Sequence, residues 1–255
     1  MKTKRNIIAL LLVGVLSYFA AGFALEHTAL AQSMNIDLGK SGSGTATGRM
    51  IQLMALLTVL SLAPSILVMT TSFMRIIIVL SFLRSALGLQ QTPPNQVLIS
   101  LALFMTAFIM APAFEQSYNE GVRPLLEEKI TEEQALENIG TPFHSFMMKH
   151  VRAKDLELFA SMSPDTKIES PEDTPYRILV PAFMISELKR AFEIGFLIFI
   201  PFVIIDMLVA SILMAMGMMM LPPVMISLPF KLIFFVLVDG WYMVCGSLIK
   251  SFGTV

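Results

Sequence analysis

Two aspartates in apolar surroundings are the first candidates for chemistry in this chain. Asp206 follows the uncharged apolar run 196–205, and Asp239 lies inside the last apolar stretch, which ends near residue 249. Two carboxylates that share one site could act as an intramembrane aspartyl protease, but only Asp239-Gly240 resembles the glycine-framed pattern of such a site. We favour the alternative, in which Asp206 pairs with a basic residue or caps a neighbouring helix end.

The remaining reactive side chains form no catalytic or cofactor-binding pattern. His144 and His150 are six residues apart, so a helix would not place them on one face as metal ligands. The single cysteine, Cys245, cannot form an intrachain disulfide and has no zinc or haem spacing. No glycine-rich phosphate loop occurs in the sequence. We therefore predict no enzymatic activity, no metal and no cofactor.

A group of methionines suggests deformable packing in place of catalysis. Five of the chain's 20 methionines fall within seven residues, beside Gly217 and a double proline: Met214, Met216, Met218, Met219 and Met220. Methionine is flexible and polarizable, so it adapts to changing partners. Scattered methionines would be core or lipid-facing, but three consecutive ones on a turn cannot all pack inward. A ring of such loops would form a deformable apolar constriction.

The composition places these residues in a membrane protein. Of 255 residues, 55% are hydrophobic and only 15% are charged, whereas soluble domains average about 25% charged residues. The net charge of −1 offers no field for a polyanion, which argues against nucleic acid as a partner. Residues 115–177 carry 13 acidic and 7 basic side chains, more than half of all the charges. We infer an acidic soluble insert between two apolar blocks.

The N-terminus has the three parts of a secretory signal peptide. Lys2, Lys4 and Arg5 precede the apolar run 7–25, and Ala29-Leu30-Ala31 provides an A-x-A end. We predict cleavage after Ala31, so that residues 1–31 are removed; the alternative is an uncleaved N-terminal membrane helix. In both cases the next segment is exported. Its glycines and serines, in residues 32–49, predict a flexible periplasmic arm.

Prolines and glycines divide the apolar blocks into helical hairpins. In residues 50–114, the charge-free run 50–74 is long enough to cross a bilayer. The double proline in residues 90–95 predicts a turn before a helix from about Asn95 to Ala111. In residues 178–255, the segment 217–223 predicts the turn of a second hairpin.

The acidic insert, residues 115–177, is predicted to be small, helical and soluble. Thr131-Glu132-Glu133-Gln134 has the form of a capping box, and Gly140 and Pro142 should stop the helix that it begins. A second helix is expected over residues 142–160, followed by a loop over 163–175. The fold class is therefore all-α, with membrane-inserted helical hairpins and a helical periplasmic insert.

Charges near the later spans conflict with a simple four-span topology. An exported arm places Arg75 and Arg84 on the cytoplasmic side and the insert outside, as the positive-inside rule requires, but it leaves Lys189-Arg190 on the wrong side. Further charges lie within or beside the later spans: Glu187, Glu193, Asp206, Lys231 and Asp239. A lone charge at the bilayer centre costs about 2.5–3.5 kcal/mol or more. These side chains must pair, face water or lie outside the hydrocarbon.

Several long motifs resemble one known family. They are residues 181–195, 201–206, 214–223, 228–231 and 238–241, and the match extends back through the insert to residues 90–94, Arg84 and Arg75. On these motifs, over residues 50–252, the chain resembles the FliP family of bacterial flagellar biosynthesis proteins. The resemblance implies a core pore-forming subunit of the flagellar type III secretion export gate. That gate passes unfolded rod, hook and filament proteins across the inner membrane.

The resemblance also implies an assembly and a location. Members of this family form a ring of five copies, completed by one FliR and surrounded by FliQ. This assembly works with FlhA and FlhB, and FliO helps to assemble it. The expected location is the bacterial inner membrane within the flagellar basal body, with the insert and the mature N-terminus on the periplasmic side. In such a ring, charges could pair across subunits.

The same motifs also predict site residues by resemblance to the family. Three match the family's methionine gasket, which seals the closed pore: Met218, Met219 and Met220. Four match charged positions of the signatures and are expected as inter-subunit contacts or buried charges: Asp206, Glu187, Lys189 and Arg190.

Two other functions stay open. An injectisome export-gate homologue would share the motifs, but such relatives generally lack the N-terminal signal peptide seen in residues 1–31. A small-solute secondary transporter would explain the broken helices and Asp206. The absence of an internal repeat and the small number of spans argue against it.

Overall fold

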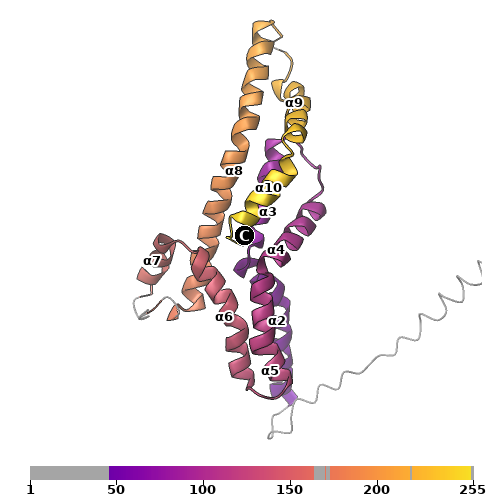
Figure 1. The fold of residues 1–255 in the computed structure, drawn as a ribbon. Helices are drawn as coiled ribbons and strands as arrows, with labels where there is room; N and C mark the ends of the chain where they lie inside the picture. The colour runs from indigo at the N-terminus through magenta and orange to yellow at the C-terminus, as the bar shows by residue number, and fades with distance from the viewer. Residues whose placement is uncertain (1–45, 164–169, 171–172, 219, 254–255) are drawn as a thin grey trace, which may run out of the picture. The chain divides into compact units, whose positions relative to one another are not determined.

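The computed structural model describes residues 46–163, 170, 173–218 and 220–253. The described part of the chain is helical and contains no strand, which confirms the all-α fold class (Figure 1). The chain divides into two units, residues 1–53 and 54–255, and the packing below is that of the second. The predicted signal peptide with Ala31, and the arm up to residue 45, lie outside the described residues.

The first apolar run is two helices where we expected one. Helix α2 (Ala46–Thr70) ends before the run does, and α3 (Phe73–Ala86) leaves the Pro64–Thr70 segment at 78°. At the bend, the Thr71 hydroxyl accepts a hydrogen bond from the backbone N–H of Phe73 at 3.5 Å. Such side-chain bonds offer the backbone an alternative to the helix. As a result, Arg75 does not follow the end of a membrane span: it lies in the first turn of α3.

The turn predicted at residues 90–95 is confirmed. Helix α3 ends in a Schellman motif, in which Gly88 adopts a φ of 76° and the N–H of Leu89 donates to the Arg84 carbonyl. The Arg84 guanidinium then bonds to the Pro93 carbonyl at 3.3 Å and to the side chain of Asn95. Helix α4 (Asn95–Ser117) begins there, as predicted, but continues past the expected end at Ala111.

The insert begins as an extension of α4. A π-helical turn, η1 (Tyr118–Val122), and the short α5 (Arg123–Leu126) lead to α6 (Glu132–His150). The predicted capping box is confirmed: the N–H of Gln134 donates to the Thr131 hydroxyl at 3.3 Å, and the Gln134 side chain accepts from the Thr131 N–H at 3.2 Å.

The predicted end of this helix at Gly140 and Pro142 was wrong. Helix α6 runs through both residues to His150, and the second helix of the insert, α7, covers only Ala153–Ser161. Pro142 is buried on the α6 face, and a Cβ at Gly140 would come within 2.7 Å of the Tyr176 hydroxyl. Burial of this face outweighs the one backbone hydrogen bond that proline removes.

The C-terminal block is a long helix followed by two short ones. Helix α8 (Tyr176–Ala215) passes through Pro181 and Pro201 without ending. The hairpin predicted at residues 217–223 is confirmed, because α9 (Pro223–Leu237) turns back beside α8 (Figure 1). The last apolar stretch is broken at Asp239, where the chain bends by 62° before α10 (Gly240–Lys250).

Helix α3 packs against both α8 and α4. The largest buried cluster joins α3, α4, α8 and the end of α10: Ile76, Val79, Leu80, Leu98, Ala102, Met105, Ile109, Ala191, Leu248 and Phe252. A second cluster, which includes Leu83, Phe202 and Phe235, joins α3 to α8 and α9. These contacts hold the charged residues of α3 against α8.

Within the described residues, two helical segments are long and apolar enough to cross a membrane. They are Asn95–Leu126 and Tyr176–Ala215. The number rises to four only if each bent pair, α2 with α3 and α9 with α10, is counted as one span. The four-span picture therefore depends on two broken elements.

Gly195 tests the close packing of α8 on α3. An added Cβ would lie 2.5 Å from the Phe82 ring, which is itself packed against Phe192 and Phe199. We expect Gly195→Ala to lower the free energy of unfolding by about 1–3 kcal/mol, as overpacking does. Thermal unfolding of the purified protein measures this. Gly246→Ala is the matched control, because nothing lies within 4 Å of its Cβ; equal effects at both positions would contradict the close approach.

Candidate functional site

The methionine loop lies at the turn between α8 and α9. Gly217 has a φ of 74°, and the N–H groups of Gly217 and Met218 donate to the carbonyls of Met214 and Leu213, both at 3.0 Å. This Schellman motif ends α8 and needs a residue that tolerates a positive φ. Met220 is 99% exposed and Met218 is 43% exposed, whereas Met219 lies outside the described residues. The backbone entering the turn is anchored, and the described methionine side chains at its end are exposed.

An ion pair between a buried lysine and a partly buried aspartate holds the two arms of this hairpin together. Lys231 of α9 lies 2.6 Å from the Asp206 carboxylate of α8 and donates to the Ala86 carbonyl, at the end of α3, at 3.3 Å. The Ser227 hydroxyl donates to the other oxygen of Asp206. The prediction that Asp206 pairs with a basic residue is confirmed. Lys231 and Ser227 were not identified from the sequence as its partners.

The two aspartates do not share a site. The Asp206 carboxylate is bound by the Ser227 hydroxyl and the Lys231 ammonium group, whereas Asp239 follows the far end of α9 with a φ of 50°. The helical rise separates Lys231 from the end of α9 by about 9 Å, so the two carboxylates are held apart. The geometry does not support an aspartyl protease dyad.

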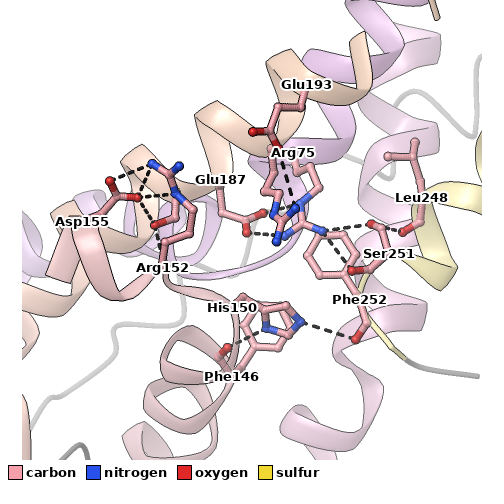
Figure 2. Close-up of polar contacts among 12 residues, drawn as sticks. Arg75, Phe146, His150, Arg152, Asp155, Glu187, Glu193, Leu248, Ser251 and Phe252 are labelled. Carbon is pink, nitrogen blue, oxygen red and sulfur yellow. Dashed lines mark hydrogen bonds and ion pairs between the residues drawn. The ribbon is translucent and has the colours of Figure 1, made fainter. Parts of the chain in front are cut away.

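A second ion pair, in which both side chains are buried, connects α3, α8 and the residues after α10 (Figure 2). The Arg75 guanidinium binds both oxygens of Glu187, with Nε 2.8 Å from Oε2. Its Nη1 donates to the Ser251 hydroxyl at 2.9 Å and to the Ser251 carbonyl at 3.2 Å, and its Cζ lies 3.7 Å above the Phe252 ring. Arg75 is 3% exposed and Glu187 is fully buried. Bidentate pairing satisfies charges that would otherwise be costly to bury.

The charged strip that the motifs predicted is therefore divided between two environments. Glu187 faces inward and has no exposed surface left for a neighbouring subunit. Lys189 and Arg190 are exposed and each lies near Glu193 of the same helix, at 3.5 and 3.7 Å. Exposed pairs of this kind contribute little to stability, so these two side chains are free to meet a partner.

A third charged group, which sequence reasoning missed, attaches α7 to α8. Arg152 binds the Asp155 carboxylate at 2.8 Å through two nitrogens (Figure 2). Asp155 also accepts a hydrogen bond from Ser186 of α8 at 2.6 Å. Burial alone would raise the pKa of Asp155, but the hydrogen bonds from Ser186 and Arg152 and the charges of Arg152 and Lys189 lower it. In the sequence, the Arg-x-x-Asp spacing at the start of a helix was the pattern that could have indicated this pair.

The two histidines contact different backbone carbonyls. His144 Nε2 lies 2.7 Å from the Thr174 oxygen, whereas His150 Nδ1 lies 2.8 Å from the Phe146 oxygen. The His150 ring also packs against Phe146 and Phe252, with centroids 4.5 and 5.3 Å away (Figure 2). In the described part of the chain, no three His, Cys, Asp or Glu side chains are grouped to hold a metal ion. Both histidines therefore take part in helix packing.

Comparisons with known proteins agree on one family. The model of the FliP family matches residues 56–248. Flagellar biosynthetic protein FliP of Caulobacter vibrioides is 57% identical over 242 residues, which cover 94% of this chain and 90% of the relative. The protein of the same name from Bacillus subtilis is 58% identical over 202 residues, covering 79% and 91%, and that from Aquifex aeolicus is 49% identical over 204 residues, covering 79% and 85%.

The Arg75–Glu187 pair predicts strongly coupled mutations. Glu187→Ala leaves the guanidinium buried without its partner, and we expect the free energy of unfolding to fall by about 3–5 kcal/mol. The double variant Arg75→Met, Glu187→Leu removes both charges and should recover most of that loss. Thermal unfolding in detergent measures both effects, and the exposed Lys189→Ala is the control. A double variant that is no more stable than Glu187→Ala would show that the two charges are not coupled.

The Asp155 carboxylate predicts a pH-dependent contribution to stability. Its folded-state pKa lies below the unfolded value of about 3.9. The stabilisation is therefore complete above that value and is lost as the pH falls through the folded pKa. We expect Asp155→Asn to be less stable than the wild type at pH 7 by about 1.5–3 kcal/mol. The difference should shrink below about pH 4. Unfolding measured from pH 7 to pH 3 tests this, and a constant difference over that range would contradict it.

Proposed function

Because this chain belongs to the FliP family, we propose that it is a core pore-forming subunit of the flagellar type III export gate, which passes unfolded rod, hook and filament proteins across the bacterial inner membrane. The names of the family and of the three relatives described above are not names of enzymes: the relatives are called flagellar biosynthetic proteins. A transport role in flagellum assembly is the function that these names and the helical fold support.

The observation that best supports this proposal is the difference between the exposed methionine loop and the paired residues of α8 and α9 behind it. Asp206, Lys231 and Ser227 hold α8 and α9 together, whereas Met218 and Met220 extend into solvent from the turn. A seal that closes and then admits a passing chain needs soft apolar side chains on a fixed support. We propose that Met218 and Met220, together with Met219, form this gasket in a ring of five copies.

The surface of α8 supports assembly with other subunits. Large apolar side chains on this helix are exposed in the isolated chain, among them Phe192, Phe196, Leu197, Met207, Leu208 and Ile212. Exposed apolar surface of this extent marks a membrane or protein interface. We propose that neighbouring copies, FliQ and FliR cover part of it, that Lys189 and Arg190 contact a neighbour, and that FlhA, FlhB and FliO act with the assembled gate.

The proposed location is the inner membrane within the flagellar basal body, with the insert on the periplasmic side. Support comes from the two helical segments that could cross a membrane and from the acidic soluble character of the insert. An injectisome role is less well supported, because the relatives carry flagellar names. A solute transporter is disfavoured because the Asp206 carboxylate is already paired with Lys231.

The gasket predicts a leak that is separable from assembly. Deletion of residues 218–220 should leave the ring intact but raise the ion conductance of the closed gate several-fold, because the apolar seal is lost. Planar-bilayer conductance of the purified gate measures the leak, and native mass spectrometry counts the subunits. Met243→Ala is the control, since Met243 is an exposed methionine of α10, away from the loop. Unchanged conductance in an intact ring would remove the gasket role.

A further inference from the structure

A groove between α4 and α6 has no role in the function proposed above. It has a volume of about 330 Å³, within the range of small-ligand sites. Its apolar lining comes from α4, α6 and the residues after α10: Ile109, Pro112, Ala113, Pro142, Phe146 and Phe252. The two helices run antiparallel, because Ser117 of α4 bonds to the Ile139 carbonyl and Phe114 packs on Phe143.

One cation at this groove has no partner among the described residues. His150 is held by the carbonyls of Phe146 and Phe252, and the Gln116 amide bonds to Glu120. Lys149 is exposed, lines the groove, and makes no hydrogen bond or ion pair within the described part of the chain. The groove thus combines an apolar lining with an unpaired ammonium group.

Charge is segregated along the insert. Residues 120–137, which run from η1 into the first part of α6, carry six acidic side chains and two basic ones, Arg123 and Lys129. The opposite end, where α6 finishes and α7 begins, carries Lys149, Arg152 and Lys154 against Asp155 and Glu157, and its net charge is positive although Arg152 is paired with Asp155. Because α6 returns antiparallel to α4, this basic end lies beside the apolar part of α4, where the helix would leave the hydrocarbon.

An exposed apolar row leads along α4 from the groove toward the start of the helix. Pro112, Phe108 and Phe104 are spaced four residues apart, so they follow one another on the helix surface. Phe108 is 64% exposed and Phe104 is 77% exposed. A cation beside such a row matches a ligand that has an anionic head and a long apolar chain.

We propose that this groove binds an anionic phospholipid of the surrounding membrane, with its phosphate on Lys149 and an acyl chain along Pro112, Phe108 and Phe104. The site rests on the membrane location proposed above. Basic side chains at the membrane surface attract anionic lipid by about 1 kcal/mol each, and the apolar row adds burial of the chain. Free phosphate would contact only the ammonium, and a zwitterionic lipid would bring no net charge to it.

Native mass spectrometry of the full chain in detergent, titrated with phosphatidylglycerol, tests the site. We expect Lys149→Gln to weaken binding about five-fold, the effect of losing about 1 kcal/mol, and Lys149→Arg to retain it. Ala113→Phe should also weaken binding, because it fills the groove. Lys154→Gln is the matched control: it removes one exposed cation of the same basic end, outside the groove.

The other outcomes each overturn the proposal. These are equal binding of phosphatidylcholine, loss of the lipid on addition of inorganic phosphate at equal concentration, or the same weakening in Lys154→Gln as in Lys149→Gln. Circular dichroism and the subunit count of each variant show whether it folds and assembles. Unsubstituted protein that assembles normally but binds both lipids equally overturns the lipid site and leaves the export-gate function standing.

Discussion

The buried ion pair between Arg75 and Glu187 is the constraint on which the arrangement of helices depends. Neither charge can be left unpaired in the interior without a cost of several kcal/mol, so α3 and α8 must meet in one register. The remaining donors of Arg75 bind Ser251, and its guanidinium lies on the Phe252 ring. That ring in turn contacts Phe146 and His150 of α6. One guanidinium therefore joins the start of α3 to α8, to the end of the described chain and to the insert.

The Lys231–Asp206 pair applies the same constraint at the other end of α3. Lys231 reaches the carbonyl of Ala86 as well as Asp206, so α3 is held by a charged group at each end and by apolar packing between them. On α8 the acidic members of the two pairs, Glu187 and Asp206, are 19 positions apart, about 28 Å along the helix. This frame supports the turn that carries Met218 and Met220. Its base, held by Lys231 and Ser227, and its exposed end are the combination that the proposed methionine gasket requires.

The pairing also accounts for the charges that conflicted with a simple membrane topology. Glu187, Asp206 and Lys231 lie in apolar sequence, but each is paired within the chain and need not meet lipid. Lys189, Arg190 and Glu193 stay exposed together on one face of α8. The inward charges thus stabilise the packing of the helices, and the outward ones remain on the surface. Asp239 serves neither purpose: it occupies the bend before α10.

Local chemistry was enough to predict the helical fold class, the turns at residues 90–95 and 217–223, and the capping box at Thr131, because proline, glycine and capping side chains act within a few residues. The long motifs likewise identified the family. The sequence did not predict the bend at Thr71, the continuation of α6 through Gly140 and Pro142, or the choice of Glu187 as the partner of Arg75, 112 residues away. These features depend on which helices pack together. Burial of the α6 face outweighs the local cost of a proline, and a buried guanidinium is paired by whichever carboxylate the packing of α8 brings to it.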